Sequence, residues 1–206
     1  MVTIQSVYNE FMRAYHGQCS MIADSTIIEQ GNLQFKGHSF SHEMYLAIVE
    51  NCFMQIYLAW EAFLEKSFIS YLQNASDLQG NSYLRYGLPV NDEHAYDMLR
   101  GTKSYPDWTN IDEVNRLAKI YFEHSGPFVI LKTPPAEFLE MKTIRNRISH
   151  VSTNSQKQFN TLLARNIAQT NIQPGDYLMM FKSAGQTYFT FYVCMLKDYV
   201  EAICNK

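Results

Sequence analysis

Closely spaced cysteines are missing from this chain. Its four cysteines lie far apart and never form a C-x-x-C pair: Cys19, Cys52, Cys194 and Cys204. Zinc sites in small domains are usually built on such pairs, so no structural zinc site is expected. A chain of 206 residues also builds a core without disulfide staples. Cys52 and Cys194 lie within apolar runs, which predicts reduced thiols in the core.

An excess of positive charge and long hydrophobic runs are missing as well. The 17 Lys and Arg residues face 20 Asp and Glu residues, for a net charge of −3, which disfavours a protein that coats nucleic acid through bulk electrostatics. No uninterrupted apolar run reaches the ~18 residues of a membrane span, and the N-terminus lacks the layout of a signal peptide. We therefore expect a cytoplasmic protein without a membrane partner.

The usual motifs of metal-dependent and phosphate-loop enzymes do not occur. No H-E-x-x-H motif is present, which disfavours metal catalysis and a metal-dependent nuclease centre in particular. A Gly-rich phosphate loop and a G-x-S-x-G nucleophile elbow are also absent, and both would carry a recognisable chemistry. We expect no metal ligands and no cofactor.

Basic residues concentrate in one segment of the chain. Positions 132–165 hold six basic and two acidic residues, a net charge of +4, whereas the remainder carries −7. Such a segment attracts a phosphate backbone when its charges share one surface. Scattered solvated charges explain the same numbers equally well, so the segment leaves both interpretations open.

Hydrophobic patterning predicts an all-α chain. Ser41–Leu72 contains no Gly or Pro and is apolar around most of its circumference, which predicts a long central helix with an acidic stripe. That stripe holds Glu43, Glu50, Glu61 and Glu65. Further helices are expected at 5–16, 91–100, 109–124, 133–151, 155–169 and 187–203, with irregular structure at 17–37. Segments 128–131 and 176–181 fit either strand or helix. One multi-helix bundle over residues 1–206 is the economical arrangement.

The segment Ile144–His150 brings a proton-transfer group, a fixed cation and an amide together on the helix expected at 133–151. Histidine exchanges protons near neutral pH, and arginine binds phosphate through two parallel hydrogen bonds. Asn146 and His150 stand four residues apart and are able to touch on a helix. These groups suffice for RNA cleavage in which the 2′-hydroxyl attacks the adjacent phosphate without a metal.

Structural roles explain the same residues in another way. Arg145 falls at the edge of an apolar helix face, which is formed by Phe138, Met141, Ile144 and Ile148. A cation there needs an anion, and Glu61 on the central helix is the candidate partner. His150 near a helix end is favoured by the helix dipole alone. Arg147 falls opposite the apolar stripe and is expected at the surface.

Two segments together resemble the HEPN superfamily (higher eukaryotes and prokaryotes nucleotide-binding). Arg145-Asn146-Arg147-Ile148-Ser149-His150 is similar to its R-(N/D/H)-x-x-x-H signature. The run Tyr57–Glu65, with the sequence YLAWEAFLE, resembles the "WEaFLe" helix of a bacterial HEPN branch. The two segments occur in the same order and at comparable distance as in that branch. The resemblance covers roughly residues 41–171, and many members of the superfamily are metal-independent ribonucleases.

The resemblance implies a set of roles and partners. It assigns catalysis to Arg145 and His150, with Asn146 as the polar residue that follows the arginine. Arg147 is a weaker candidate for contact with a substrate phosphate. Glu61 and Glu65 are weaker candidates for substrate contact or for orienting Arg145 or His150, and a solvated acidic stripe explains them as well. It further implies an obligate homodimer in which two such helices face each other. The expected substrate is RNA, and the expected setting is a toxin or antiviral effector with an antitoxin or defence-system partner protein.

The sequence is also compatible with two other classes of function. One is a non-catalytic HEPN-type dimer that binds nucleotide, RNA or a partner protein. The other is a purely structural helical module in which Arg145 and Glu61 form a buried pair. The ribonuclease hypothesis predicts RNA cleavage, and the non-catalytic dimer predicts ligand binding without cleavage. The structural module predicts neither, but a large loss of stability when Arg145 is replaced.

Overall fold

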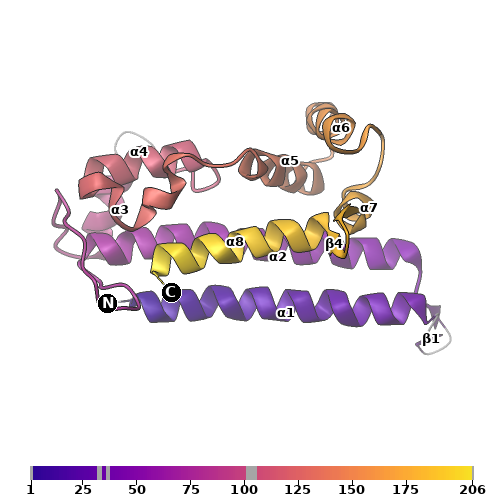
Figure 1. Ribbon diagram of the computed structural model, residues 1–206, viewed down its shortest axis with the longest axis horizontal. Helices are drawn as coiled ribbons and strands as arrows, with labels where there is room; N and C mark the ends of the chain where they lie inside the picture. Colours follow the sequence, from indigo (N-terminus) through magenta and orange to yellow (C-terminus); the bar gives the residue numbers. More distant parts are fainter. Residues whose placement is uncertain (1, 32–33, 36–37, 101–105, 206) are drawn as a thin grey trace. The chain divides into compact units, whose positions relative to one another are not determined.

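Helices account for most of the chain in the computed structural model, which describes residues 2–31, 34–35, 38–100 and 106–205 (Figure 1). The expected all-α, multi-helix fold is confirmed, with only two short β-hairpins beside the helices among the described residues. The chain divides into two compact units: three of the four boundaries fall inside long helices, and the fourth falls at 135/136, ahead of the helix that begins at Glu137. The expectation of a single domain over 1–206 stays a prediction.

The three long helices are α1 (Ile4–Gln30), α2 (His42–Leu72) and α8 (Tyr188–Cys204). Helix α2 confirms the long helix expected from Ser41 to Leu72. The irregular structure expected at 17–37 is wrong over 17–30, where α1 continues through Gly17. Burial of Ile22 and Ser25 along this stretch outweighs the weak helix propensity of glycine. Positions 32–33 and 36–37 of that segment lie outside the described residues.

The first unit comprises residues 1–12, 59–135 and 196–206. It holds α3 (Asp92–Arg100), α4 (Ile111–Tyr121) and the 3-10 helix η1 (Glu123–Lys132). The Asn110 side chain caps α4 near the predicted start of the helix 109–124, but α4 ends at Tyr121, before the predicted end at His124. The segment 128–131, for which the sequence fitted either strand or helix, belongs to η1. In the core of this unit, the ring of Phe68 packs against the rings of Trp108, Phe122 and Phe128.

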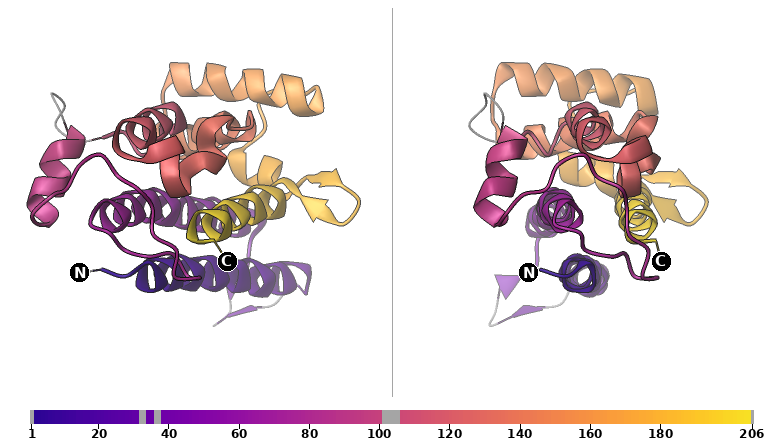
Figure 2. Two further views of the ribbon diagram at one scale, coloured as in Figure 1. Left: turned by 60° about the vertical axis from the view of Figure 1, so that its left-hand side comes forward. Right: turned by 90° about the vertical axis from the view of Figure 1, so that its left-hand side faces the viewer.

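The second unit comprises residues 13–58 and 136–195. It holds the hairpin of β1 (Gln34–Phe35) and β2 (His38–Ser39), then α5 (Glu137–Ser149), α6 (Thr153–Ile167) and α7 (Pro174–Met179). A second hairpin, β3 (Phe181–Ser183) with β4 (Gln186–Thr187), leads directly into α8 and is drawn in yellow in Figure 2. This hairpin is absent from the sequence-based prediction. The segment 176–181 is mainly helical, as part of α7.

Helix α5 begins later than the sequence predicts. The predicted start of the helix 133–151 at Thr133 is wrong, because Thr133 instead ends the preceding 3-10 helix with non-helical backbone angles (φ −129°, ψ 76°). The residue before a proline is disfavoured in helical geometry, and Thr133 is followed by Pro134 and Pro135. Helix α5 therefore starts at Glu137, and its N-cap Ala136 offers no side-chain hydrogen bond.

Candidate functional site

The segment Arg145–His150 occupies the last turn of α5 and the residue that follows it. Phe138, Met141 and Ile144 are buried, which confirms them as the apolar face. The exposure of the side chains then rises along the helix: Arg145, Asn146, Arg147 and Ile148 are half-buried, and Ser149 and His150 are exposed. The segment therefore runs from the core of the second unit to its surface.

The side chain of Asn146 contacts Arg145. Arg145 donates from Nη1 to Asn146 Oδ1 at 3.4 Å. The backbone N–H of His150 donates to the Asn146 carbonyl at 3.0 Å, but no hydrogen bond joins the two side chains among the described residues. The amide thus orients the guanidinium, whereas the sequence favoured contact with the imidazole or a phosphate oxygen.

His150 caps the C-terminal end of α5 with an extended backbone (φ −132°, ψ 113°). Its carbonyl accepts from Ser155 Oγ at 2.5 Å and from the Ser152 N–H at 3.0 Å. Ser152 and Ser155 form the capping box that starts α6, which satisfies N–H groups that the helix leaves open. The turn therefore holds the His150 backbone in place, while its side chain is exposed to solvent.

Arg147 is half-buried, where the sequence predicted a surface position. Its Nε is buried without a hydrogen-bond partner among the described residues. Burial raises the pKa of Glu50, and a hydrogen bond from the Gly175 N–H and the charge of Arg147 partly offset that rise. Arg147 thus lies within electrostatic reach of a carboxylate on α2.

Glu61 lies on α2 in the first unit and is half-buried. Glu50 and Glu65 are half-buried too, and only Glu43 of the predicted acidic stripe is exposed. The stripe is therefore not a uniformly solvated face. Among the motif residues, the second unit brings together Arg145, Asn146, Arg147 and His150, and Glu61 belongs to the other unit.

Metal-ligating side chains do not gather anywhere in the described part of the chain: it holds no group of three or more His, Cys, Asp or Glu residues able to bind an ion. His38 and His42 are four residues apart, but β2 ends at Ser39 and α2 begins at His42, so they do not share a helix. Searched in the same way, the described helices include none long and apolar enough to cross a membrane.

The cysteines are all free thiols. Cys52 is buried, as the sequence predicts, whereas Cys194 is only half-buried. Burial raises the pKa of the Cys52 thiol to about 11, so this group stays protonated and unreactive at neutral pH. Cys52 is therefore a core side chain and carries no chemistry of the site.

Comparison with protein-family models, curated proteins and solved structures found no match. Hypotheses about function therefore rest on the residues of the site and on the resemblance of two sequence segments. The geometry is that of a surface site in which a half-buried cation, oriented by an amide, stands one helical turn from an exposed imidazole.

The sequence did not predict a cluster of interacting side chains around Glu140, beside the site. Glu140 is 7% exposed and accepts hydrogen bonds from Arg165 Nη2 and Tyr192 Oη, both at 2.6 Å. Its partners are 25 and 52 positions away in the chain. The sequence signal was only that Glu140 interrupts a basic segment, and nothing local indicated which residues neutralise it.

Proposed function

We propose that this protein is a metal-independent endoribonuclease that cleaves RNA through attack of the 2′-hydroxyl on the adjacent phosphate. The observation that carries the proposal is the end of α5, where Arg145, held by Asn146, stands beside the exposed His150. The HEPN resemblance adds the setting of a toxin or antiviral effector that acts with an antitoxin or defence-system partner. RNA is the proposed substrate.

Each of the three residues has a defined task in the proposed reaction. His150 removes the proton from the 2′-hydroxyl as the new bond between the 2′-oxygen and phosphorus forms. Arg145 stabilises the negative charge that accumulates on the phosphate oxygens. The bond from phosphorus to the 5′-oxygen breaks, and that oxygen takes up the proton that His150 carries. The products carry a 2′,3′-cyclic phosphate and a 5′-hydroxyl, and Asn146 keeps the guanidinium in position.

A homodimer is part of the proposal, as the resemblance implies. A large apolar side chain directly after the motif is exposed, since Val151 is 95% exposed. Exposed apolar groups next to polar ones are typical of protein contact surfaces. This supports a second copy against the end of α5, which would place two Arg145 and His150 sets near one RNA strand.

The test is RNA cleavage by the purified protein in the presence of EDTA. Wild type should cleave, and His150→Ala should lose about 10²-fold or more of the rate, because proton transfer by a positioned side chain contributes that much. His16, another exposed histidine of the second unit, provides the control, and His16→Ala should stay within about twofold of wild type. Undiminished cleavage by His150→Ala, or loss of wild-type cleavage on chelation, contradicts the mechanism.

A non-catalytic dimer that binds nucleotide or RNA is the second candidate. It is favoured by the imidazole of His150, which has no hydrogen-bond partner among the described residues to orient it. This function predicts saturable nucleotide binding without cleavage. A purely structural role would instead appear as a loss of about 3–5 kcal/mol of stability in Arg145→Ala, with neither binding nor cleavage in wild type.

A further inference from the structure

A pocket of about 440 Å³ lies between α5 and α6, directly beside the motif. Its lining includes Asn146, the basic residues Lys142 and Arg165, and the apolar side chains of Leu139 and Leu162. Pockets of this size accommodate small organic ligands. Because Asn146 also contacts Arg145, a molecule in the pocket would lie next to the proposed reaction centre.

The arginine of this pocket is held in position before any ligand arrives. Arg165 donates from Nη2 to Glu140 at 2.6 Å and from Nε to Asn166 at 3.3 Å. Its side chain is 57% exposed, and its Nη1 has no hydrogen-bond partner among the described residues. Pre-positioning lowers the entropy cost of binding an anion, so Arg165 presents a fixed donor to the pocket.

Glu140 supports Arg165 without cancelling the positive charge of the lining. One of its oxygens accepts from Arg165, and the other accepts from the hydroxyl of the fully buried Tyr192 at 2.6 Å. Burial raises the pKa of the Tyr192 hydroxyl, so this group remains a donor. Both Glu140 oxygens are therefore occupied by hydrogen bonds. Because Lys142 and Arg165 outnumber this one carboxylate, the pocket lining carries a net positive charge.

The remaining lining determines which anion fits. The Nδ2 amide of Asn146 has no hydrogen-bond partner among the described residues, so it offers a donor. Leu139 and Leu162 provide apolar contact for the flat face of a base or for a sugar. A phosphate group attached to an apolar ring system therefore suits this pocket better than a free inorganic ion.

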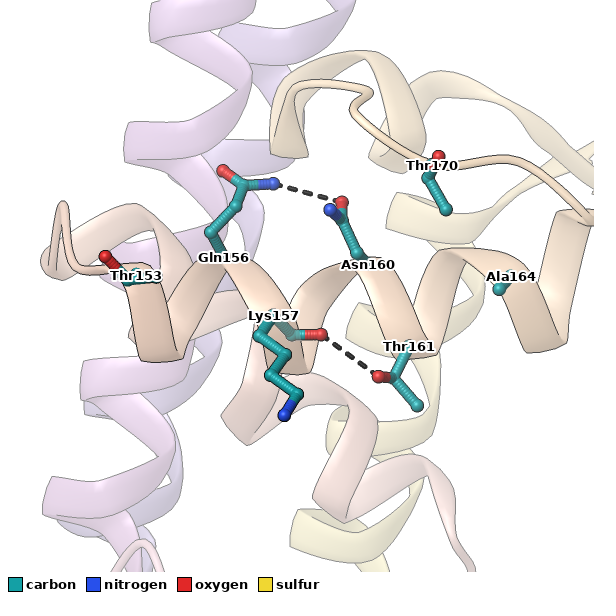
Figure 3. A pocket seen from close by; sticks show the side chains of 7 residues that line it. All are labelled: Thr153, Gln156, Lys157, Asn160, Thr161, Ala164 and Thr170. Carbon is teal, nitrogen blue, oxygen red and sulfur yellow. Dashed lines mark hydrogen bonds between the residues drawn. The ribbon is translucent and has the colours of Figure 1, made fainter.

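A second pocket on the outer side of α6 is less suited to a charged ligand. Figure 3 shows that Gln156 and Asn160 point toward each other there, with a hydrogen bond of 3.0 Å. Asn160 also donates to Asn171 at 3.0 Å, so these polar groups satisfy one another. Lys157 extends away from the pair (Figure 3), and it is the only charged side chain in that lining.

We propose that the pocket between α5 and α6 binds one nucleotide of the RNA strand, adjacent to the phosphate that is cleaved. Arg165 and Lys142 bind its phosphate, Leu139 and Leu162 contact its base or sugar, and Asn146 donates to its polar edge. This inference rests on the proposed ribonuclease function, because it names how that site holds its substrate. It also gives a role to part of the positive segment 132–165.

The experiment measures binding separately from cleavage. A short fluorescein-labelled oligoribonucleotide is titrated with the His150→Ala protein in EDTA, and anisotropy gives the dissociation constant. Adding Lys142→Gln or Arg165→Gln should weaken binding about tenfold, which corresponds to 1.4 kcal/mol. The slope of log affinity against log salt should fall by about 0.7 for each lost phosphate contact. Lys157→Gln on the other side of α6 should change affinity less than about twofold and leave the slope unchanged.

The outcomes separate this inference from the proposed function. Equal affinity of Lys142→Gln and Lys157→Gln overturns the pocket assignment, even if wild type cleaves RNA. Selective loss of binding in Lys142→Gln supports it, even if wild type proves inactive and the ribonuclease proposal fails. If Arg165→Gln unfolds because Glu140 loses its cation, Lys142→Gln decides alone, since it leaves the Glu140–Tyr192 hydrogen bond intact.

Discussion

Asn146 contacts a different side chain from the one that its spacing favours. Residues four apart on a helix are neighbours, which pointed to His150. Helix α5 ends at Ser149, however, and His150 adopts extended angles, so its side chain leaves the helical direction. Asn146 instead accepts from Arg145, its immediate neighbour. A helix end that lies two residues earlier than predicted is enough to change this contact.

Replacing Glu140 should lower the stability of the second unit. Glu140→Ala removes two charge-assisted hydrogen bonds, one of them from the fully buried Tyr192 hydroxyl. We expect a loss of about 2–3 kcal/mol in the free energy of unfolding, measured by urea denaturation. Glu140→Gln should lose less, because the amide keeps the volume and one acceptor oxygen.

Glu137 on the same helix provides the matched control. It lies in the first turn of α5 and is half-buried, so Glu137→Ala should cost only the helix-dipole contribution of about 0.3–1 kcal/mol. If both alanine variants unfold at the same urea concentration, the Glu140 cluster does not stabilise the second unit.

Helix boundaries were predictable where the chain carries its own start and stop signals. Asn110 caps α4, which begins close to the predicted 109, because its side chain bonds to a nearby backbone group. The predicted start of α6 at 155 is two residues late, because Ser152 caps a helix that begins at Thr153. Helix α1 is the opposite case. Gly17 would usually end it, yet the helix continues to Gln30, and the burial of Ile22 depends on residues distant in sequence.

His42 links three elements and should make stability depend on pH. Its ring nitrogens lie 3.2 Å from Asp176 of α7 and 3.2 Å from Glu29 of α1. Hydrogen bonds to Asp176 and then Glu29 raise the pKa of His42 above its ordinary 6.5. This contribution is fully present below pH 6.5 and is lost as pH rises through the raised value in the folded state.

The measurement compares melting temperatures from about pH 6 to about pH 8.5, the range in which histidines titrate. The decrease with rising pH should be larger in wild type than in His42→Gln, which cannot take up the proton. The difference should be modest, because the His42 side chain is 56% exposed and solvent screens exposed ion pairs. Identical pH dependence in the two proteins would show that the ring is not held by both carboxylates.

The assembly of the protein is predicted to be a homodimer. Sedimentation velocity should give a mass near twice the chain's 24.0 kDa at the concentrations that cleave RNA. Val151→Glu should shift the protein toward monomer, because it would bury a charge in the proposed contact. Ile27→Glu is the matched control, since Ile27 is a 65% exposed apolar residue on α1. A monomer with full activity would contradict the homodimer.

The helical fold follows from local patterns, since the long helix over 41–72 lacks helix breakers and its side chains share a helical period. The same patterns singled out Arg145, Asn146 and His150 as a group. Only the tertiary structure revealed that Glu140 is neutralised by Arg165 and Tyr192, and that a pocket opens beside Asn146. The physical reason is range: caps and periodicity act within a few residues, whereas burial and ion pairing join side chains that the sequence separates by 25 and 52 positions.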